Sequence, residues 1–234
     1  MRPVRRGTPV IFADGRPYGK AMNDLLAKLG PYCSYCERRL PSGAEVEHIE
    51  AKSQYPDKER TWNNFLISCK NCNSCKRQHL ALSVDQWLIP DRDNTAYAFV
   101  YREDGRVIES GVSVSVDLLA GKTLEVLGLN NEKNLSRSLP DQRKQARLQA
   151  ELWLTRWMEF SPSVKEKMAE LLVGHAKSEG FFSVWMAVFQ KVPEVRIELL
   201  KAFPGTERAC FDPVTTAPIT PHPNTDGLAH GGKC

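Results

Sequence analysis

Four cysteines in two identically spaced pairs are the residues whose chemistry is plainest in this sequence. Cys33 and Cys36 form the first Cys-x-x-Cys pair, and Cys69 and Cys72 form the second. Such a turn directs two thiolates toward one point, and two turns supply the tetrahedral sulfur set that Zn²⁺ prefers. The spacing predicts a structural zinc site. The alternatives are two clusters of buried free thiols, or a site in which Cys75 replaces Cys69 or Cys72.

A zinc ion with four cysteine ligands has no open coordination position, so any catalysis must come from other residues. Glu47 and His48 lie between the two pairs, Asn64 follows them, and Asn73 comes directly after the second pair. A neutral imidazole with a pKa of about 6.5 can take a proton from water near pH 7. The side chains of Glu47 and Asn73 offer oxygen atoms, which suit Mg²⁺ or Mn²⁺ better than zinc. This set of residues predicts a metal-dependent site for phosphodiester cleavage.

Each of these residues also has an interpretation without catalysis. A single histidine on an apolar strand is more often structural, the Asn63-Asn64 pair is typical of a turn, and Asn73 is suited to cap a helix. Their order within the cysteine frame nevertheless favours one site. Adjacent residues of a strand point to opposite faces, so the strand must end or bend near Glu47 and His48 if both serve that site.

The order of these residues resembles the HNH endonuclease family, which has a ββα-metal fold. The matching elements are Glu47-His48, Asn64 followed by Phe-Leu, and Cys-x-x-Cys-Asn-x-x-Lys ending at Lys76. The resemblance implies that two strands and a helix hold one divalent cation, with His48 as the general base. It further implies that Glu47 and Asn73 ligate the catalytic cation, in positions where the family usually has Asp and often has His. Asn64 would orient the His48 ring through its backbone or its amide.

Longer segments resemble the PtuB family, the HNH effector subunits of Septu-type and retron-associated bacterial anti-phage systems. That resemblance implies nucleic-acid cleavage in phage defence and an ABC-type ATPase subunit (PtuA-like) as the partner. The sequence contains no P-loop, which fits an ATPase on a separate chain. The matching segments are 1–3, 46–56, 62–66, 202–206 and 210–212.

The charge distribution and composition limit the class of protein. Residues 1–80 carry 14 Lys and Arg against 8 Asp and Glu, whereas the rest carries 18 against 20. A positive surface favours a polyanion such as nucleic acid, and we expect DNA rather than RNA. Lys70, Lys76 and Arg77 are candidate phosphate contacts, although a solvated charged face would look the same. Without a long apolar run, a signal-peptide core or an even set of cysteines, we expect a cytoplasmic protein that neither enters a membrane nor forms disulfides.

Hydrophobic periodicity predicts a mainly helical α+β fold with three parts. A zinc-stabilised ββα-metal nuclease module is expected over 1–110, a helical region for core and partner docking over 111–211, and a disordered tail over 212–234. Within these parts we expect a helix over 17–29, a hairpin around Asp104-Gly105 with strand-like runs at 96–100 and 106–109, and helices over 141–160, 163–177, 181–191 and 194–202.

Two other functions remain open from the sequence. A non-catalytic zinc ribbon that binds nucleic acid would explain the cysteines and the basic first part, but it would leave Glu47, His48, Asn64 and Asn73 without a role. A stand-alone HNH nuclease of the restriction type would share the chemistry and differ in its assembly.

Overall fold

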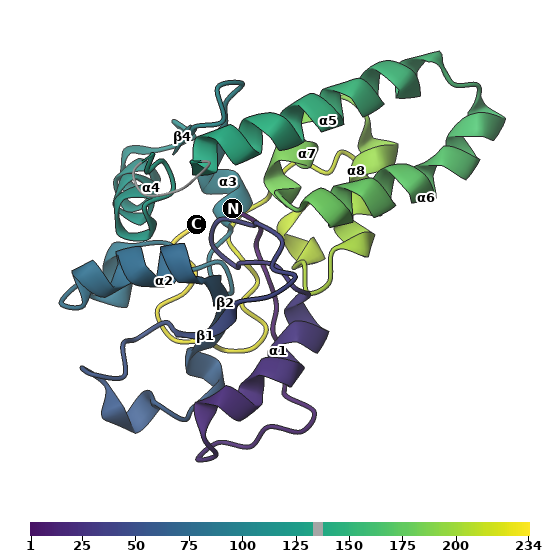
Figure 1. The fold of residues 1–234 in the computed structure, drawn as a ribbon. Coiled ribbons are helices and arrows are strands. Elements are labelled where there is room, and N and C mark those ends of the chain that lie inside the picture. The colour runs from purple at the N-terminus through teal and green to yellow at the C-terminus, as the bar shows by residue number, and fades with distance from the viewer. Residues whose placement is uncertain (133–137) are drawn as a thin grey trace.

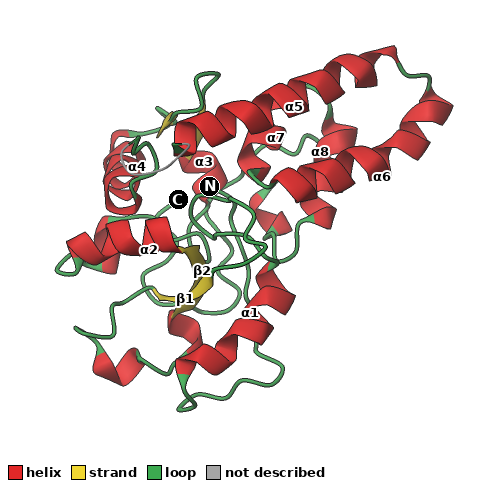
Figure 2. Ribbon diagram, viewed as in Figure 1, coloured by secondary structure: helices red, strands yellow, loops and turns green. Residues whose placement is uncertain are grey.

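Helices dominate the structure and two small antiparallel sheets complete it, as Figure 1 and Figure 2 show. The computed structural model describes residues 1–132 and 138–234. The predicted α+β, mainly helical class is confirmed. The helices are α1 (Met22–Leu29), α2 (Lys70–Lys76), α3 (Thr95–Ala98), α4 (Val114–Leu127), α5 (Leu139–Glu159), α6 (Pro162–Glu179), α7 (Phe182–Val188) and α8 (Pro193–Ala202). The strands are β1 (Ala44–His48), β2 (Phe65–Cys69), β3 (Phe99–Tyr101) and β4 (Val107–Glu109), and short 3₁₀ helices cover Tyr18–Ala21, Pro56–Lys58, Trp62–Asn64, Arg77–His79, Val84–Gln86 and Arg208–Cys210.

The strands β1 and β2 and the helix α2 form a ββα unit at the centre of the N-terminal part. In the antiparallel register Ala44 faces Cys69 at one end of the hairpin, and His48 faces Phe65 at the other. Every residue of β2 is buried, because this apolar strand runs through the core. On β1, Glu47 is the one fully buried residue. The hairpin therefore carries Cys69 at one end and His48 at the other.

The segment before α1 packs onto this unit. The helix predicted over 17–29 is present as a 3₁₀ turn followed by α1, and it ends at Gly30, whose φ of 74° suits glycine. The Asp24 carboxylate on α1 accepts the Phe12 backbone N–H at 2.6 Å, which ties the preceding loop to the helix. The Phe12 ring lies 5.7 Å from the Phe65 ring of β2. The N-terminal residues therefore belong to the same core as the ββα unit.

The later helices form a second hydrophobic core. α5 and α6 run antiparallel and extend away from the ββα unit, and α7 and α8 pack against them (Figure 1). Trp157, Phe182 and Trp185 are buried in this core, and Trp153 packs against it. α4 packs on α2 and β4 within the first core, which therefore continues past residue 110. In the described residues no helix combines the length and apolarity needed to cross a membrane.

The hairpin predicted around Asp104-Gly105 is confirmed, with β3 antiparallel to β4 and Gly105 at a φ of 81°. Its first strand starts later than predicted. Residues 95–98 form a helical turn, because the Asn94 side chain accepts the Ala96 N–H and caps it. A side-chain cap of this kind overrides the strand propensity of the following residues.

Residues 212–234 differ from the disordered tail expected from their composition. They lie against the first core through polar contacts, because the buried Asn94 side chain donates to the Ile219 carbonyl and Arg92 donates to the Ala229 carbonyl at 2.7 Å. Backbone carbonyls accept these bonds, so the segment needs no apolar periodicity of its own to be held.

Candidate metal centre and active site

Cys33, Cys36, Cys69 and Cys72 form one buried cluster. Their sulfur atoms all lie within 4.8 Å of one another, and the Cys36 and Cys69 sulfurs are 3.7 Å apart. A tetrahedral zinc site with bonds of about 2.3 Å has sulfur–sulfur edges of about 3.8 Å. Cys75 is outside the cluster and half-buried. The cluster therefore has the composition and spacing of a structural zinc site, made of the four cysteines with the Cys-x-x-Cys spacing.

Two segments bring these cysteines together. The Ser34 backbone N–H donates to the Ile67 carbonyl at 2.8 Å, which ties the first pair to β2. The second pair spans the end of β2 and the first turn of α2, where the Cys69 sulfur accepts the Cys72 N–H. Because Cys69 and His48 occupy opposite ends of the hairpin, about four residues or 13 Å apart along the strands, the cluster supports the scaffold and does not contact the histidine.

The His48 ring is held in one orientation and one tautomer. Its Nε2 lies 2.9 Å from the Glu59 backbone carbonyl oxygen, which can only accept a hydrogen bond. Nε2 therefore carries the proton, and the lone pair is on Nδ1. The rings of Tyr18 and Phe65 meet the imidazole edge-on at centroid distances of 4.8 and 5.2 Å. Burial lowers the pKa of His48 below its usual value, and the charges of the nearby lysines act in the same direction.

Asn64 acts on the histidine less directly than the sequence predicted. Its side-chain oxygen accepts the Glu50 N–H at 2.8 Å, and its amide donates to the carbonyls of Glu50 at 2.9 Å and Lys58 at 3.1 Å. Among the described residues it makes no hydrogen bond to the His48 ring. Asn64 instead braces the loop between the strands, and this loop carries the Glu59 carbonyl that bonds the ring. The ring's partner is the backbone carbonyl of Glu59 and neither the backbone nor the amide of Asn64, so any orienting effect of Asn64 passes through this loop.

Glu47 points to the other side of β1, as strand geometry requires, and pairs with a cation on α2. The Lys76 Nζ lies 2.7 Å from a Glu47 carboxylate oxygen and donates to the His48 carbonyl at 2.6 Å. Both side chains are buried. Burial raises the pKa of the Glu47 carboxyl, and the adjacent ammonium opposes that rise. These two contacts tie Lys76 to the scaffold, and because Lys76 also lines the cleft that contains His48, its role as a phosphate contact stays a prediction.

Asn73 and Glu45 add oxygen atoms on the same side as Glu47. Glu45 and Glu47 are two residues apart and share a face of β1. The Asn73 amide nitrogen donates to a Glu45 carboxylate oxygen at 2.5 Å, which fixes the amide orientation. Carboxylate and amide oxygens are hard ligands of the kind that Mg²⁺ and Mn²⁺ take. The donor set therefore fits a hard divalent cation, with the Lys76 ammonium as a competing positive charge.

Glu47 and His48 line one cleft of about 360 Å³ although they lie on opposite faces of the strand. β1 ends at His48, so the cleft wraps around the end of the strand and reaches both faces. This is the strand ending that the sequence argument required. Asn73 and the exposed Arg77 line the same cleft, whereas Lys70 is exposed on the first turn of α2 and does not line it.

Three residues of this region had no signal in the sequence. Glu59 contributes a backbone carbonyl, which any residue could supply. Tyr18 reaches the His48 ring from a 3₁₀ helix thirty residues before His48 in the sequence, and Lys52 lines the cleft from the loop between the strands. The spacing of polar residues around Glu47 and His48 does not indicate any of them.

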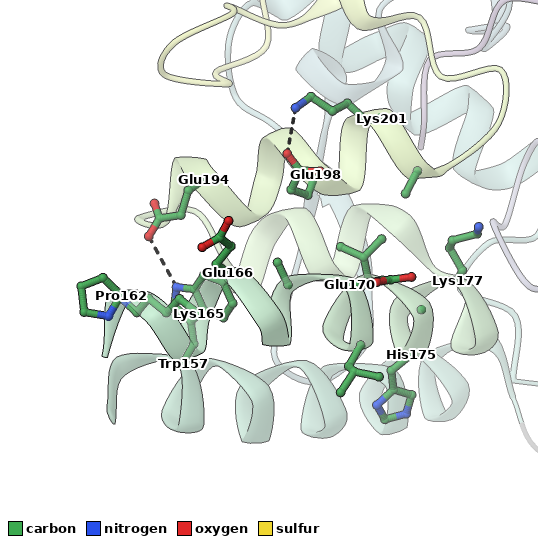
Figure 3. Close-up of a pocket in the computed structure, with 15 residues that line it drawn as sticks. Trp157, Pro162, Lys165, Glu166, Glu170, His175, Lys177, Glu194, Glu198 and Lys201 are labelled. Atoms are coloured by element: carbon green, nitrogen blue, oxygen red, sulfur yellow. Dashed lines mark hydrogen bonds and ion pairs between the residues drawn. The ribbon is translucent and has the colours of Figure 1, made fainter. Parts of the chain in front are cut away.

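A larger groove of about 1310 Å³ lies between α6 and α8, away from these residues (Figure 3). Its lysines and glutamates largely offset one another, as in the Lys201–Glu198 pair at 2.8 Å. The Lys165 ammonium lies over the Trp157 ring, whose indole N–H reaches Glu194 at 3.4 Å. The groove contains none of the predicted site residues.

Comparison with known proteins agrees with the geometry of the ββα unit. Residues 33–79 match the family model of HNH endonucleases. Over 68 residues the chain is 43% identical to the Septu protein PtuB of Bacillus thuringiensis. The aligned segment covers 28% of this chain and 26% of that protein. The match thus spans about a quarter of the length of the curated relative. The chain carries an HNH endonuclease domain at residues 33–79, and the resemblance predicted from the sequence is confirmed.

Proposed function

We propose that this chain is a metal-dependent nuclease that hydrolyses phosphodiester bonds of nucleic acid, with DNA as the preferred substrate. One observation carries the proposal. His48, with its Nε2–H fixed on the Glu59 carbonyl and its Nδ1 bonded to no group among residues 1–132 and 138–234, shares a cleft with Glu47 and Asn73. A base beside oxygen ligands for a cation is the arrangement that phosphodiester hydrolysis needs.

In the proposed reaction the His48 Nδ1 takes a proton from a water molecule. The water oxygen forms a bond to phosphorus, and the phosphorus–oxygen bond on the opposite side breaks. The Glu59 carbonyl supports the imidazolium that forms, because it still accepts the Nε2–H. Tyr18 and Phe65 keep the ring from rotating away from the attacking water.

Glu47 and Asn73 are the proposed ligands of the catalytic cation, Mg²⁺ or Mn²⁺, and Glu45 would orient the Asn73 amide through its hydrogen bond. The bound cation would neutralise the charge that develops on the phosphate and on the leaving oxygen. The proposed occupant of the four-cysteine cluster is Zn²⁺, which would fix the two cysteine turns and the start of α2.

The proposed biological role is that of an effector in anti-phage defence, acting with an ABC-type ATPase subunit. The name of the matched relative, a Septu protein, supports the first part. The ATPase subunit is what the resemblance to PtuB-type effectors implies. The helical region α5–α8 is the proposed docking region for this partner.

A substrate panel tests the proposed function. The purified chain, with and without a candidate ATPase partner, is incubated with plasmid, single-stranded DNA and tRNA in Mg²⁺ or Mn²⁺. We expect cleavage of DNA that EDTA stops and added cation restores. Glu47→Gln and Asn73→Ala should raise the cation concentration needed for half-maximal activity. Cleavage that is insensitive to EDTA and to both substitutions would contradict the proposal.

A further inference from the structure

At the His48 cleft, Lys52 has no role in the function proposed so far, and Tyr18 has only that of holding the His48 ring. Tyr18 belongs to the 3₁₀ helix Tyr18–Ala21, outside the HNH domain at 33–79. Lys52 belongs to the loop between β1 and β2, within the domain. Both line the cleft that contains His48. The segment before the domain thus contributes one wall of its site.

These two residues contact each other as well as the histidine. The Lys52 Nζ lies 3.3 Å from the Tyr18 hydroxyl and 4.4 Å from the centre of the Tyr18 ring. The same ring meets the His48 imidazole edge-on at 4.8 Å. Tyr18 therefore touches the proposed base on one side and holds a cation on the other.

Lys52 is available to an incoming anion in a way that Lys76 is not. Lys76 is buried and bonds Glu47 and the His48 carbonyl, so two of its three N–H donors are used inside the scaffold. The Lys52 side chain is 45% exposed, and its ion pair with Glu59, at 3.4 Å, is a loose surface contact. Exposed pairs of this kind are weak and exchange readily with other anions. The hydrogen bond to the Tyr18 hydroxyl raises the pKa of Lys52, and the Glu59 carboxylate acts in the same direction, so its charge is retained at neutral pH.

We propose that Lys52 binds the phosphate to be cleaved, and that Tyr18 is a positioning residue that fixes both Lys52 and the His48 ring. This inference rests on the proposed nuclease function. It makes the segment before the HNH domain part of the site, because Asp24 on α1 anchors the loop that leads to Tyr18. The alternative without a functional role is that Tyr18 only packs against His48 and Lys52 only forms a surface ion pair with Glu59.

Kinetics of four variants at Lys52 and Tyr18, with a fifth variant as control, separate these alternatives. Lys52→Gln removes the charge, and kcat/KM should fall about 100-fold, the size of loss seen when one transition-state donor is removed. Lys52→Arg keeps the charge and should retain most of the activity. Tyr18→Leu should lower kcat at least about 10-fold with little change in KM, because the base is misplaced. Tyr18→Phe keeps the ring and should lose less. Lys20→Gln, an exposed lysine on the same 3₁₀ helix, is the matched control.

A binding measurement tests Lys52 without depending on cleavage. Fluorescence anisotropy with short fluorescein-labelled DNA, single-stranded and duplex, is recorded in Ca²⁺ over a range of salt concentrations. A lysine on phosphate should lower the slope of log K against log salt by about one when it is removed. If the wild type cuts nothing, the nuclease function fails, and a lower slope for Lys52→Gln still supports the phosphate contact. If Lys52→Gln matches Lys20→Gln in salt slope and in any cleavage, the inference is overturned.

Discussion

The ammonium group of Lys76 lies 2.7 Å from a carboxylate oxygen of Glu47, and both side chains are buried between α2 and β1. This pair joins the helix to the strand that carries His48. Removing one partner of a buried pair leaves an uncompensated charge, at a cost of about 3–5 kcal/mol. We expect Lys76→Met to lower the free energy of unfolding by about that amount in urea titrations. Lys70→Met, at an exposed position on the same helix, should change it by less than about 0.5 kcal/mol. Equal stability of the two variants would contradict the role of this pair.

The Asn64 side chain makes three hydrogen bonds that brace the loop between the strands. We expect Asn64→Ala to lower the free energy of unfolding by about 1–3 kcal/mol, because it leaves partly buried backbone groups without partners. The Glu50 amide should exchange faster with deuterium, and the His48 ring signals should broaden as the Glu59 carbonyl loses its fixed position. Asn63→Ala is the control, since that side chain is exposed. If the Glu50 amide of the Asn64 variant exchanged with deuterium at the wild-type rate, the bracing role would be refuted.

The four-cysteine cluster predicts that cysteine variants differ in zinc content and in resistance to protease. Cys36→Ser removes a ligand, so the purified protein should lose its zinc and residues 33–79 should become sensitive to protease. Structural zinc sites contribute folding free energy directly, which gives a large effect. Cys75→Ser should keep about one zinc per chain and wild-type resistance, since Cys75 is outside the cluster. Metal analysis and limited proteolysis measure both. Zinc loss in the Cys75 variant would show that the ligand set is different.

The segment 212–234 should depend on the buried Asn94 side chain, which donates to the carbonyls of Cys210 and Ile219. We expect Asn94→Ala to accelerate deuterium exchange throughout this segment. Arg5→Gln removes an exposed ion pair with Asp226 and should leave exchange nearly unchanged. A segment that stays protected in the Asn94 variant would mean that its remaining contacts hold it.

Features that depend on the spacing of residues along the chain could be predicted from the sequence. The Cys-x-x-Cys pairs predicted the cluster, and apolar periodicity predicted the helices from α5 to α8. Contacts made by backbone atoms could not be predicted, because the Glu59 carbonyl that fixes His48 has no side-chain signature. The same reason hid the anchoring of residues 212–234, which depends on carbonyl groups. The Lys76–Glu47 pair could not be predicted, because a lysine in a basic segment looks the same in sequence whether it faces phosphate or a buried Glu47.

The central claim is that His48 is the base of a metal-dependent nuclease site supported by a separate cysteine cluster. Its most direct test is cleavage of supercoiled plasmid in Mg²⁺ or Mn²⁺ by wild type and by His48→Ala, with and without the ATPase partner, with zinc content measured in both proteins. The account predicts that His48→Ala loses cleavage by at least about 100-fold while it retains its zinc and its DNA binding. Equal cleavage by the variant would contradict the account. So would a wild type that binds nucleic acid without cutting it in any of these conditions, which would favour a zinc ribbon that only binds.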